Sequence, residues 1–407
     1  MVADLHEGHG CLCGANACMR VAVVGGGLGG VSVAHELLAQ ARGEIQVRML
    51  DWRGRLAAGA SGVAAGLLHP FSPRGKLLWN AELAMHRTEA LVARAEAHDP
   101  GTRPSAGLLK PARNGSEVLK LHSLAENSRG WASAVDETRA LALAPGLLLP
   151  EDVLTARTSQ SDPVALYIPN GSALNTARYL NALWAASQSL CEYANAIPGK
   201  NGHLHEKSLS LEQHNVERSE ELEHDHDAVV FACGAEALSI PESSDLPISL
   251  EGGWVCDLDC SNSDDAIDMG GLLGQPYVVP QGGGRFSIGS THEKNTSLET
   301  AIRETGEYKD APEAESHLRA KLSNILPGFE KESQSMSHRY GVRAQAPRNS
   351  LGALPIVRER KRGVIDICGF GARGLVYHAL VAHGVASAIV KMADRSLVDE
   401  VPNELIR

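Results

Sequence analysis

The chain is poor in aromatic residues and cysteine for its length, and it lacks a long apolar run. Phe, Trp and Tyr make up 4% of the 407 residues, whereas hydrophobic residues as a whole make up 43%, so Leu, Val and Ala must fill the cores. Eight cysteines are too few for a disulfide scaffold and favour a reducing compartment. No uninterrupted apolar stretch reaches about eighteen residues, so we expect no membrane span.

The N-terminal residues lack the pattern of a targeting signal. They include acidic residues and have no apolar core, unlike a secretory signal or an Arg-rich transit peptide. We expect residues 1–19 to be a disordered leader and the protein to be cytoplasmic, while a plastid or mitochondrial location stays open. The tail that holds Cys11, Cys13 and Cys18 has a C-x-C-x4-C spacing that could bind a metal. No second pair with zinc spacing follows, so we expect no metal site.

The net charge of −11 weighs against a protein that binds RNA mainly through its phosphates. Basic residues occur in short runs, such as Arg358-Glu-Arg-Lys-Arg362, which we interpret as a charged hairpin turn before a strand at 364–367. Net charge does not determine where charges gather on a surface. A tRNA partner is therefore not favoured, but it stays open.

The most informative segment is Val21-Ala-Val-Val-Gly25-Gly-Gly27-Leu-Gly-Gly30. Its first four residues predict a buried parallel strand, and its glycines have the G-x-G-x-x-G spacing of a turn that receives a pyrophosphate at a helix N-terminus. A helix at about 29–41 and a second strand at about 45–50 follow. Asp51, 21 residues after Gly30, stands where an acidic side chain accepts ribose hydroxyls. The whole arrangement predicts a dinucleotide site.

Three later segments suggest which dinucleotide binds. They are Ala60-Ser61-Gly62-Val-Ala-Ala-Gly66-Leu-Leu-His69-Pro70, the strand Asp227-Ala-Val-Val-Phe-Ala-Cys-Gly234, and Gly369-Phe-Gly371-Ala-Arg373-Gly374-Leu. In this order they resemble the D-amino-acid oxidase-like FAD-dependent oxidoreductase family, of the glycine and sarcosine oxidase type. Within that family, the resemblance is closest to the oxidase domain of the enzyme that trims carboxymethylaminomethyl-uridine at the tRNA wobble position. The likeness runs from about residue 20 to residue 395.

The resemblance implies an α/β fold with two domains. A Rossmann-type FAD-binding domain, like that of glutathione reductase, would comprise residues 20–90, 165–245 and 341–395. An α+β substrate domain with an antiparallel sheet would comprise residues 91–164 and 246–340. The wobble enzyme carries a methyltransferase domain before its oxidase; about nineteen residues precede the first strand here, so we expect that domain to be absent.

Within these domains, the residue pattern predicts several elements. We expect helices at 79–98, 174–190 and 375–392, and antiparallel strands at 252–259, 277–280 and 285–289. One or two further helices should lie between Glu299 and Leu326, ending at Pro327-Gly328. Tyr167 to Gly171 suggests a strand and a turn. Residues 200–227 carry several histidines, and we interpret them as exposed hairpin strands and not as a metal site.

The resemblance also implies a set of residues that contact FAD. Arg53 would lie beside the ribose, and backbone amides at the C-terminal glycines would stabilise the charge of a reduced flavin. No cysteine lies near 340–343, so we expect the FAD to be non-covalent. The implied cofactor-binding residues are Gly25, Gly27, Gly30, Asp51, Arg53, Ser61, Gly62, Gly234, Gly369, Gly371, Arg373 and Gly374.

Four residues are candidates for work on the substrate. Arg343, in Arg339-Tyr-Gly-Val-Arg343, resembles the family's Gly-Leu-Arg-Pro arginine that holds the substrate carboxylate, although Ala344 replaces the proline; a structural ion pair is the alternative. His69 would lie near the flavin edge, or else be a packed side chain. Arg373 adds a positive charge in the glycine-rich turn, or forms a surface ion pair. Tyr340 is a further candidate.

Three further residues complete this set of predictions. Tyr377 and His292 are expected to line the same cavity. Sarcosine oxidases use a lysine over the flavin for reaction with O2, and Ser287 aligns with it, which leaves fast use of O2 open.

We therefore expect an FAD-dependent enzyme that oxidises the C–N bond of an amine or N-substituted glycine by hydride transfer to flavin N5. Its partners would be a small carboxylate-bearing amine and O2 or another electron acceptor. One alternative is the wobble-uridine reaction on tRNA. A second is a non-catalytic flavin-binding partner protein. A nicotinamide dehydrogenase would leave the segments around Ser61 and Gly369 without a ligand.

Overall fold

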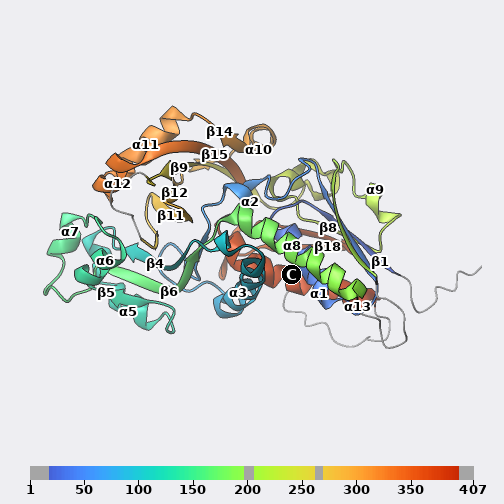
Figure 1. Cartoon of the computed structure of the whole chain (residues 1–407), viewed down its shortest axis with the longest axis horizontal. Coiled ribbons are helices and arrows are strands. Elements are labelled where there is room, and N and C mark those ends of the chain that lie inside the picture. Colours follow the sequence, from blue (N-terminus) through green and yellow to red (C-terminus); the bar gives the residue numbers. More distant parts are fainter. Residues whose placement is uncertain (1–17, 197–205, 262–268, 394–407) are drawn as a thin grey trace, which may run out of the picture.

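The computed structural model describes residues 18–196, 206–261 and 269–393. Within these ranges the elements are arranged around two sheets (Figure 1). The expected leader, residues 1–19, lies outside the described residues apart from Cys18 and the first residue of β1.

The first sheet has six strands in the described chain. Its spatial order is β18-β19-β8-β1-β2-β7, and every pair is parallel except β18 with β19. Because the strand order reverses beside β1, the crevice at the carboxyl end of β1 is where such sheets bind ligands. The strands are β1 (Met19–Val24), β2 (Ile45–Asp51), β7 (Lys207–Gln213), β8 (Ala228–Phe231), β18 (Ile356–Lys361) and β19 (Val364–Cys368).

Four long helices pack together against one face of this sheet. Leucine, valine and alanine side chains fill the core between them, as the scarcity of aromatic residues requires; Leu37, Leu183 and Ala382 are fully buried there. The helices are α1 (Leu28–Gln40), α3 (Ala81–His98), α8 (Thr176–Ala196) and α13 (Gly374–Ala393).

The helix at Gly371–Met392 is long and apolar enough to cross a membrane by length and composition. In this fold 56% of that window is buried, and the helix packs against α1 and α3 as part of the core.

The second sheet is larger and mainly antiparallel. Its order is β14-β15-β9-β12-β11-β10-β4-β6-β3, with β13 (Glu293–Lys294) paired to β9 and β5 (Ser133–Val135) paired to β6. Its other strands are β3 (Leu67–Leu68), β4 (Ser105–Pro111), β6 (Ala165–Ala173), β9 (Ser249–Asp259), β10 (Gly271–Leu272), β11 (Tyr277–Gly282), β12 (Arg285–Gly289), β14 (Gly306–Tyr308) and β15 (Gln334–Gln345).

Short helices surround this second sheet (Figure 1). They are α2 (Ala60–Val63), α4 (Gly115–Val118), α5 (Leu121–Glu126), α6 (Glu137–Leu143), α7 (Glu151–Thr155), α10 (Leu298–Glu304), α11 (Pro312–Leu322) and α12 (Pro327–Glu332). The helix α9 (Glu220–Glu223) lies beside the first sheet instead. The strands β16 (Arg348–Asn349) and β17 (Gly352–Ala353) form a separate hairpin. The α/β fold class and the antiparallel strands expected around 252–289 are confirmed.

Four local expectations were wrong. The basic run at 358–362 is not a turn as a whole, because β18 extends to Lys361 and the turn comes at Arg362 and Gly363. β7 does not form a hairpin; it pairs in parallel with β2 at the edge of the first sheet, while His203 and His205 lie outside the described residues. Pro327 begins α12 instead of ending a helix, because proline is tolerated in the first turn, where its missing N–H has no partner to lose. The segment Tyr167–Gly171 does not turn: β6 continues through it, with an irregularity opposite Gly107.

β6 also bears on the division into domains. It pairs with β4 and β3 in the second sheet, whereas the sequence predicts that an FAD-binding segment starts at residue 165. We therefore propose that this segment begins at α8, near Thr176.

Candidate functional site

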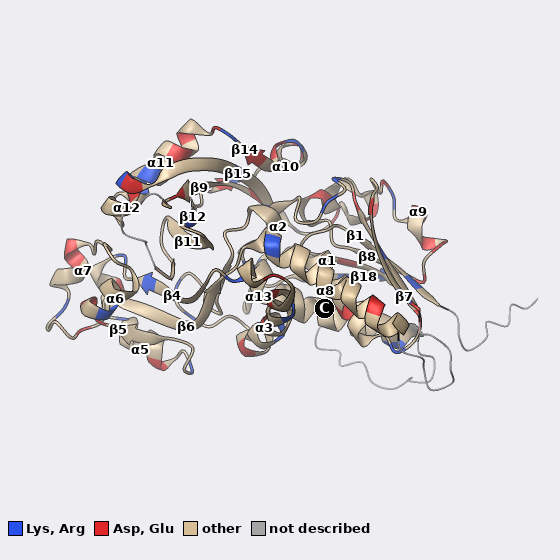
Figure 2. Cartoon of the chain, in the orientation of Figure 1, with Lys and Arg blue, Asp and Glu red and all other residues tan. Residues whose placement is uncertain are grey.

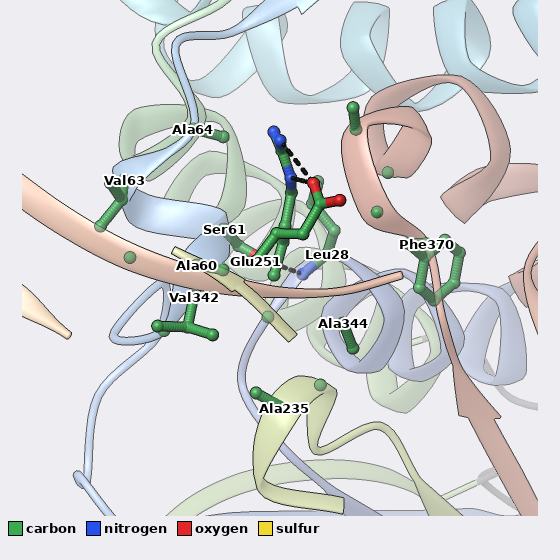
Figure 3. Close-up of a pocket in the computed structure, with 18 of the residues that line it drawn as sticks. Leu28, Ala60, Ser61, Val63, Ala64, Ala235, Glu251, Val342, Ala344 and Phe370 are labelled. Atoms are coloured by element: carbon green, nitrogen blue, oxygen red, sulfur yellow. Dashed lines mark hydrogen bonds and ion pairs between the residues drawn. The ribbon is translucent and has the colours of Figure 1, made fainter. Parts of the chain in front are cut away.

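A cavity of about 510 Å³ runs along the carboxyl edge of the first sheet and beneath the second sheet (Figure 3). Its walls come from the turn after β1, the end of β2, the loop around α2, the strands β9 and β15, and the turn before α13. It therefore lies at the switch point of the parallel sheet, which is where the glycine-rich turn predicts a dinucleotide.

The turn after β1 needs its glycines for space. Gly25 has φ +109°, and a Cβ there would lie 2.5 Å from the Ala232 carbonyl oxygen. A Cβ on Gly30 would lie 1.9 Å from the Gly25 carbonyl oxygen, so Gly30 lets α1 approach β1 closely. Gly25 and Gly27 line the cavity, whereas Gly30 lies behind them and supports the turn.

Asp51 lines the cavity next to the glycine-rich turn after β1. Its two carboxylate oxygens accept hydrogen bonds from the backbone N–H groups of Gly26 and Arg53, each at 2.9 Å. Each oxygen keeps a further lone pair for a ribose hydroxyl. The Arg53 guanidinium pairs with Glu236 at 2.8 Å and stacks over Trp52, so its side chain frames this end of the cavity.

The α2 loop connects the two sheets at the middle of the cavity. The Ser61 hydroxyl accepts a hydrogen bond from the Leu28 N–H at 3.0 Å, which ties α2 to the start of α1 (Figure 3). Gly62 does not line the cavity; a Cβ there would lie 2.0 Å from the Ala57 carbonyl oxygen, and its own carbonyl accepts from Arg339 at 2.8 Å. Gly62 thus shapes the loop from behind.

Arg339 holds that loop in place, a role that the sequence did not reveal. Its guanidinium pairs with Asp257 on β9 at 2.7 Å and donates to the Ser287 hydroxyl at 2.9 Å. Ser287 is fully buried and donates to Asp257 at 2.6 Å. Ser287 is not among the described residues that line the cavity.

The C-terminal turn forms the opposite wall. Gly369 and Gly371 have φ values of +73° and +50°, and Gly374 begins α13. All three line the cavity, together with Gly234. Glycines here leave backbone amides at a helix start open to a negatively charged group.

Arg373 lies in the same turn and lines the cavity. Burial, together with the charges of Arg348 and Arg343, lowers the pKa of this guanidinium from its usual value. Its Nη1 donates to the Phe71 carbonyl at 3.2 Å, and none of the ion pairs of the described chain includes it. Arg373 is therefore a cavity cation without an acidic partner, and not a surface ion pair.

His69 is uncharged in the cavity wall. Burial lowers its pKa to about 3, and the nearby charges of Arg373 and Lys110 act in the same direction. Its Nδ1 accepts a hydrogen bond from the Phe71 N–H at 3.3 Å, so the proton of the neutral ring resides on Nε2. His69 can then donate one hydrogen bond into the cavity.

Arg343 reaches the cavity as expected, but its guanidinium is already paired. The Glu251 carboxylate lies 2.9 Å from Nη2 and 3.3 Å from Nε, and His292 accepts from Nη2 at 3.0 Å. Glu251 and His292 both line the cavity. Burial, and then the charge of Arg343, lowers the pKa of His292, which keeps this imidazole neutral beside the guanidinium.

Two tyrosines lie elsewhere than expected. The Tyr340 hydroxyl donates to Glu293 at 2.6 Å, and the Tyr377 hydroxyl donates to the Trp79 carbonyl at 2.8 Å. Among the described residues, neither is part of the cavity lining. Tyr340 faces the opposite side of β15 from Arg339 and Arg343, because successive side chains of a strand alternate between its faces.

The cavity also contains residues that sequence reasoning missed. Lys110 lies near His69, and Arg113 lies near Lys110; burial lowers the pKa of the Lys110 amine. Tyr277 from β11 lines the cavity, and burial raises the pKa of its hydroxyl to about 12. His214 follows β7 at the Asp51 end. Their strands pair over long sequence distances, and no local motif marks them.

One cluster of metal-ligand type occurs in the described chain, formed by Cys256, Glu315 and His338, outside the cavity. Glu315 is engaged by Arg319 at 2.8 Å and by His338 at 3.1 Å, and burial raises the pKa of the Cys256 thiol to about 11. The Cys256 thiol contacts the Ser335 hydroxyl at 3.4 Å, so each of the three groups has a protein partner, and we propose no metal for them.

Comparisons with known proteins agree with this geometry. The family model described as FAD dependent oxidoreductase matches residues 20–388. Among curated proteins, the chain is 26% identical over 378 residues to the tRNA 5-methylaminomethyl-2-thiouridine biosynthesis bifunctional protein MnmC of Nitrosospira multiformis, covering 90% of this chain and 56% of that protein. The MnmC of Polaromonas naphthalenivorans is 27% identical, with 91% and 56% covered. The chain thus spans about half the length of these relatives.

Solved structures share the fold. Glycine oxidase from Geobacillus kaustophilus superposes with a TM-score of 0.67 at 21% identity, covering 96% of this chain and 99% of that one. Iminodiacetate oxidase from Chelativorans sp. BNC1 superposes with a TM-score of 0.65 at 19% identity, covering 95% and 98%.

Proposed function

Because this chain belongs to the FAD dependent oxidoreductase family, we propose that it oxidises the C–N bond of a carboxylate-bearing amine, such as an N-substituted glycine. The observation that carries the proposal is Arg373, a cavity cation without an acidic partner beside the glycine-rich turn. An anionic group of the substrate would supply the missing charge, and a planar guanidinium suits a carboxylate.

The residues of the cavity fit FAD. Gly25 and Gly27 leave space for a pyrophosphate at the start of α1, Asp51 offers oxygens to a ribose, and the turn at Gly369 and Gly371 exposes amides at the far end. When bound, the flavin supplies the two-electron acceptor for the C–N bond. We propose that it binds non-covalently: among the described lining residues the one thiol is that of Cys233, and it donates to the Val24 carbonyl oxygen at 3.6 Å.

The chain's own residues would bind and orient the amine. Arg373 attracts the carboxylate, and neutral His69 donates one hydrogen bond from Nε2 without adding charge. The apolar wall from Val63, Leu67 and Tyr277 excludes water. Such burial lowers the pKa of a substrate amine, which favours the neutral form that can lose hydride from its α-carbon. The imine product is then split by water into an amine and a carbonyl compound.

Two relatives support the amine class by their names. One solved neighbour is a glycine oxidase and another an iminodiacetate oxidase, both oxidases of amines that bear carboxylates. O2 or another acceptor would reoxidise the cofactor. We propose a cytoplasmic location, as the sequence suggests.

A second candidate is the wobble-uridine reaction, because the curated relatives are named for tRNA 5-methylaminomethyl-2-thiouridine biosynthesis. Charge does not favour it. Acidic and basic residues are interspersed over the described ribbon (Figure 2). The basic run of β18 is neutralised: Arg358 pairs with Asp245, and Arg360 with Asp366.

The decisive experiment is anaerobic bleaching of the flavin absorbance band. The purified holoenzyme is mixed with glycine, sarcosine, proline, D-amino acids, a carboxymethylaminomethyl-uridine nucleoside, or tRNA that carries this nucleoside. We expect a small carboxylate-bearing amine to bleach the band. Bleaching by the modified tRNA alone, with strongly salt-dependent binding, would favour the wobble reaction. A yellow protein that nothing bleaches would instead be a non-catalytic flavin-binding partner.

A further inference from the structure

Glu251 is one of the acidic side chains that line the cavity, and it is paired with Arg343. The two residues are direct cross-strand partners of β9 and β15. Their ion pair is 2.9 Å long, and both side chains are less than a third exposed, at 28% and 29%. The dashed lines at Glu251 in Figure 3 mark these contacts. His292 accepts a hydrogen bond from the same Nη2 at 3.0 Å and brings no negative charge.

The ion pair between Glu251 and Arg343 offsets the positive charge of Arg343 in the cavity that a substrate would enter. Each of three arginines that line the cavity has a glutamate: Arg53 has Glu236, Arg113 has Glu117 and Arg343 has Glu251. In the described chain Arg373 differs, since its charge is met by a backbone carbonyl. Arg373 is thus the one lining guanidinium in the described chain that can receive a carboxylate without displacing a glutamate; the amine of Lys110, which also lines the cavity, lies 4.0 Å from Glu117.

A second carboxylate on the substrate would meet an occupied guanidinium. To reach Arg343 it would have to displace Glu251, and the displaced carboxylate would remain in the cavity beside a like charge. Like-charge contacts in a partly buried site are a strong means of rejecting a wrong ligand. A neutral or cationic substituent does not meet this obstacle.

We propose that Glu251 determines specificity, by neutralising Arg343 so that the cavity accepts substrates with one carboxylate and rejects those with two. This inference rests on the proposed function, because it assumes that the cavity binds carboxylate-bearing amines.

The test compares two ligands that bind without turnover. Acetate carries one carboxylate and malonate carries two, and their affinities are measured by the change they cause in the visible absorbance of the bound flavin. We expect Glu251→Gln, which keeps the size of the side chain but removes its charge, to raise the affinity for malonate relative to acetate at least about tenfold. Glu251→Asp keeps the charge and should preserve the preference of the wild type.

Two further variants keep the proposal falsifiable. Arg343→Gln leaves Glu251 unpaired and should lower the relative affinity for malonate, even if Glu251→Gln does not fold. Glu137→Gln removes a similar pair, with Arg157 at 2.9 Å, outside the cavity and should change nothing. A malonate-to-acetate ratio that is the same in the wild type and in either Glu251→Gln or Arg343→Gln would overturn the proposal. Because no turnover is needed, the ratio is informative even if no amine bleaches the flavin, which would refute the proposed function alone.

Discussion

A buried guanidinium is stabilised by an anion or by several dipoles around it. Among the described residues, the hydrogen bond of the Arg373 guanidinium goes to the Phe71 carbonyl oxygen. His69 lies close to it and is neutral, and the nearby charges of Arg348 and Arg343 are positive. At the scale of single residues, the affinity of the cavity for anions should therefore depend mainly on this side chain.

We predict that Arg373→Met weakens acetate binding to the holoenzyme by about 10- to 100-fold, because a charge-assisted hydrogen bond to a carboxylate is lost. Flavin absorbance titration measures the change. Arg48→Met is the matched control, since Arg48 pairs with Glu212 at 2.6 Å on the sheet and lies outside the cavity. Equal acetate affinity in the Arg373 variant and the wild type would show that the carboxylate binds elsewhere.

At the scale of elements, the site depends on how closely α1 approaches β1. Gly30 allows this approach, and Ser61 then fastens the α2 loop to the start of α1. The turn after β1, the loop and the helix thus form one connected support for a dinucleotide.

Gly30→Ala should abolish stable FAD binding, because its Cβ would lie 1.9 Å from the Gly25 carbonyl oxygen and would push α1 away from β1. The FAD retained through gel filtration, read from the ratio of absorbance at 450 and 280 nm, measures the effect. Gly43→Ala makes the same chemical change after the end of α1, where a Cβ meets nothing within 4 Å. It should retain FAD as the wild type does. Full FAD content in Gly30→Ala would refute this role of the glycine.

At the scale of the whole molecule, several buried histidines are held neutral. Burial lowers the pKa of His35 and His378 to about 4 and that of His69 to about 3. In the unfolded chain a histidine has its ordinary value of about 6.5. Below that pH the unfolded state binds protons that the folded state does not, so stability is lost as the pH falls.

For one such histidine, we predict a loss of about 1.4 kcal/mol in the free energy of unfolding between pH 7.5 and pH 5.5. His35→Asn should remove this share of the pH dependence, because asparagine does not titrate. Urea unfolding at the two pH values measures it. His122→Asn, at an exposed position on α5, is the control and should leave the pH dependence unchanged. If the pH dependence of the free energy of unfolding is unchanged in His35→Asn, His35 takes up its proton over the same pH range in the folded and the unfolded protein.

Local patterns in the sequence determined much of this protein. The spacing of Gly25, Gly27 and Gly30 and the position of Asp51 predicted a strand, a turn and a helix, because turn sterics and strand hydrophobicity act over a few residues. The core helix α13 follows from the same short-range rules. The segments around Ser61 and Gly369 pointed to the FAD family through their residues.

Only the tertiary structure decided the charges of the cavity. Arg343 was visible in the sequence, but its partner Glu251 lies 92 positions away and meets it through the register of β9 and β15. Tyr340, a lesser candidate on the same strand, faces the other side of β15. Lys110 reached the site through β4, and β7 joined the parallel sheet instead of a hairpin. Register and sheet order depend on the burial of whole faces, and a one-residue shift reverses them, so short motifs cannot specify them.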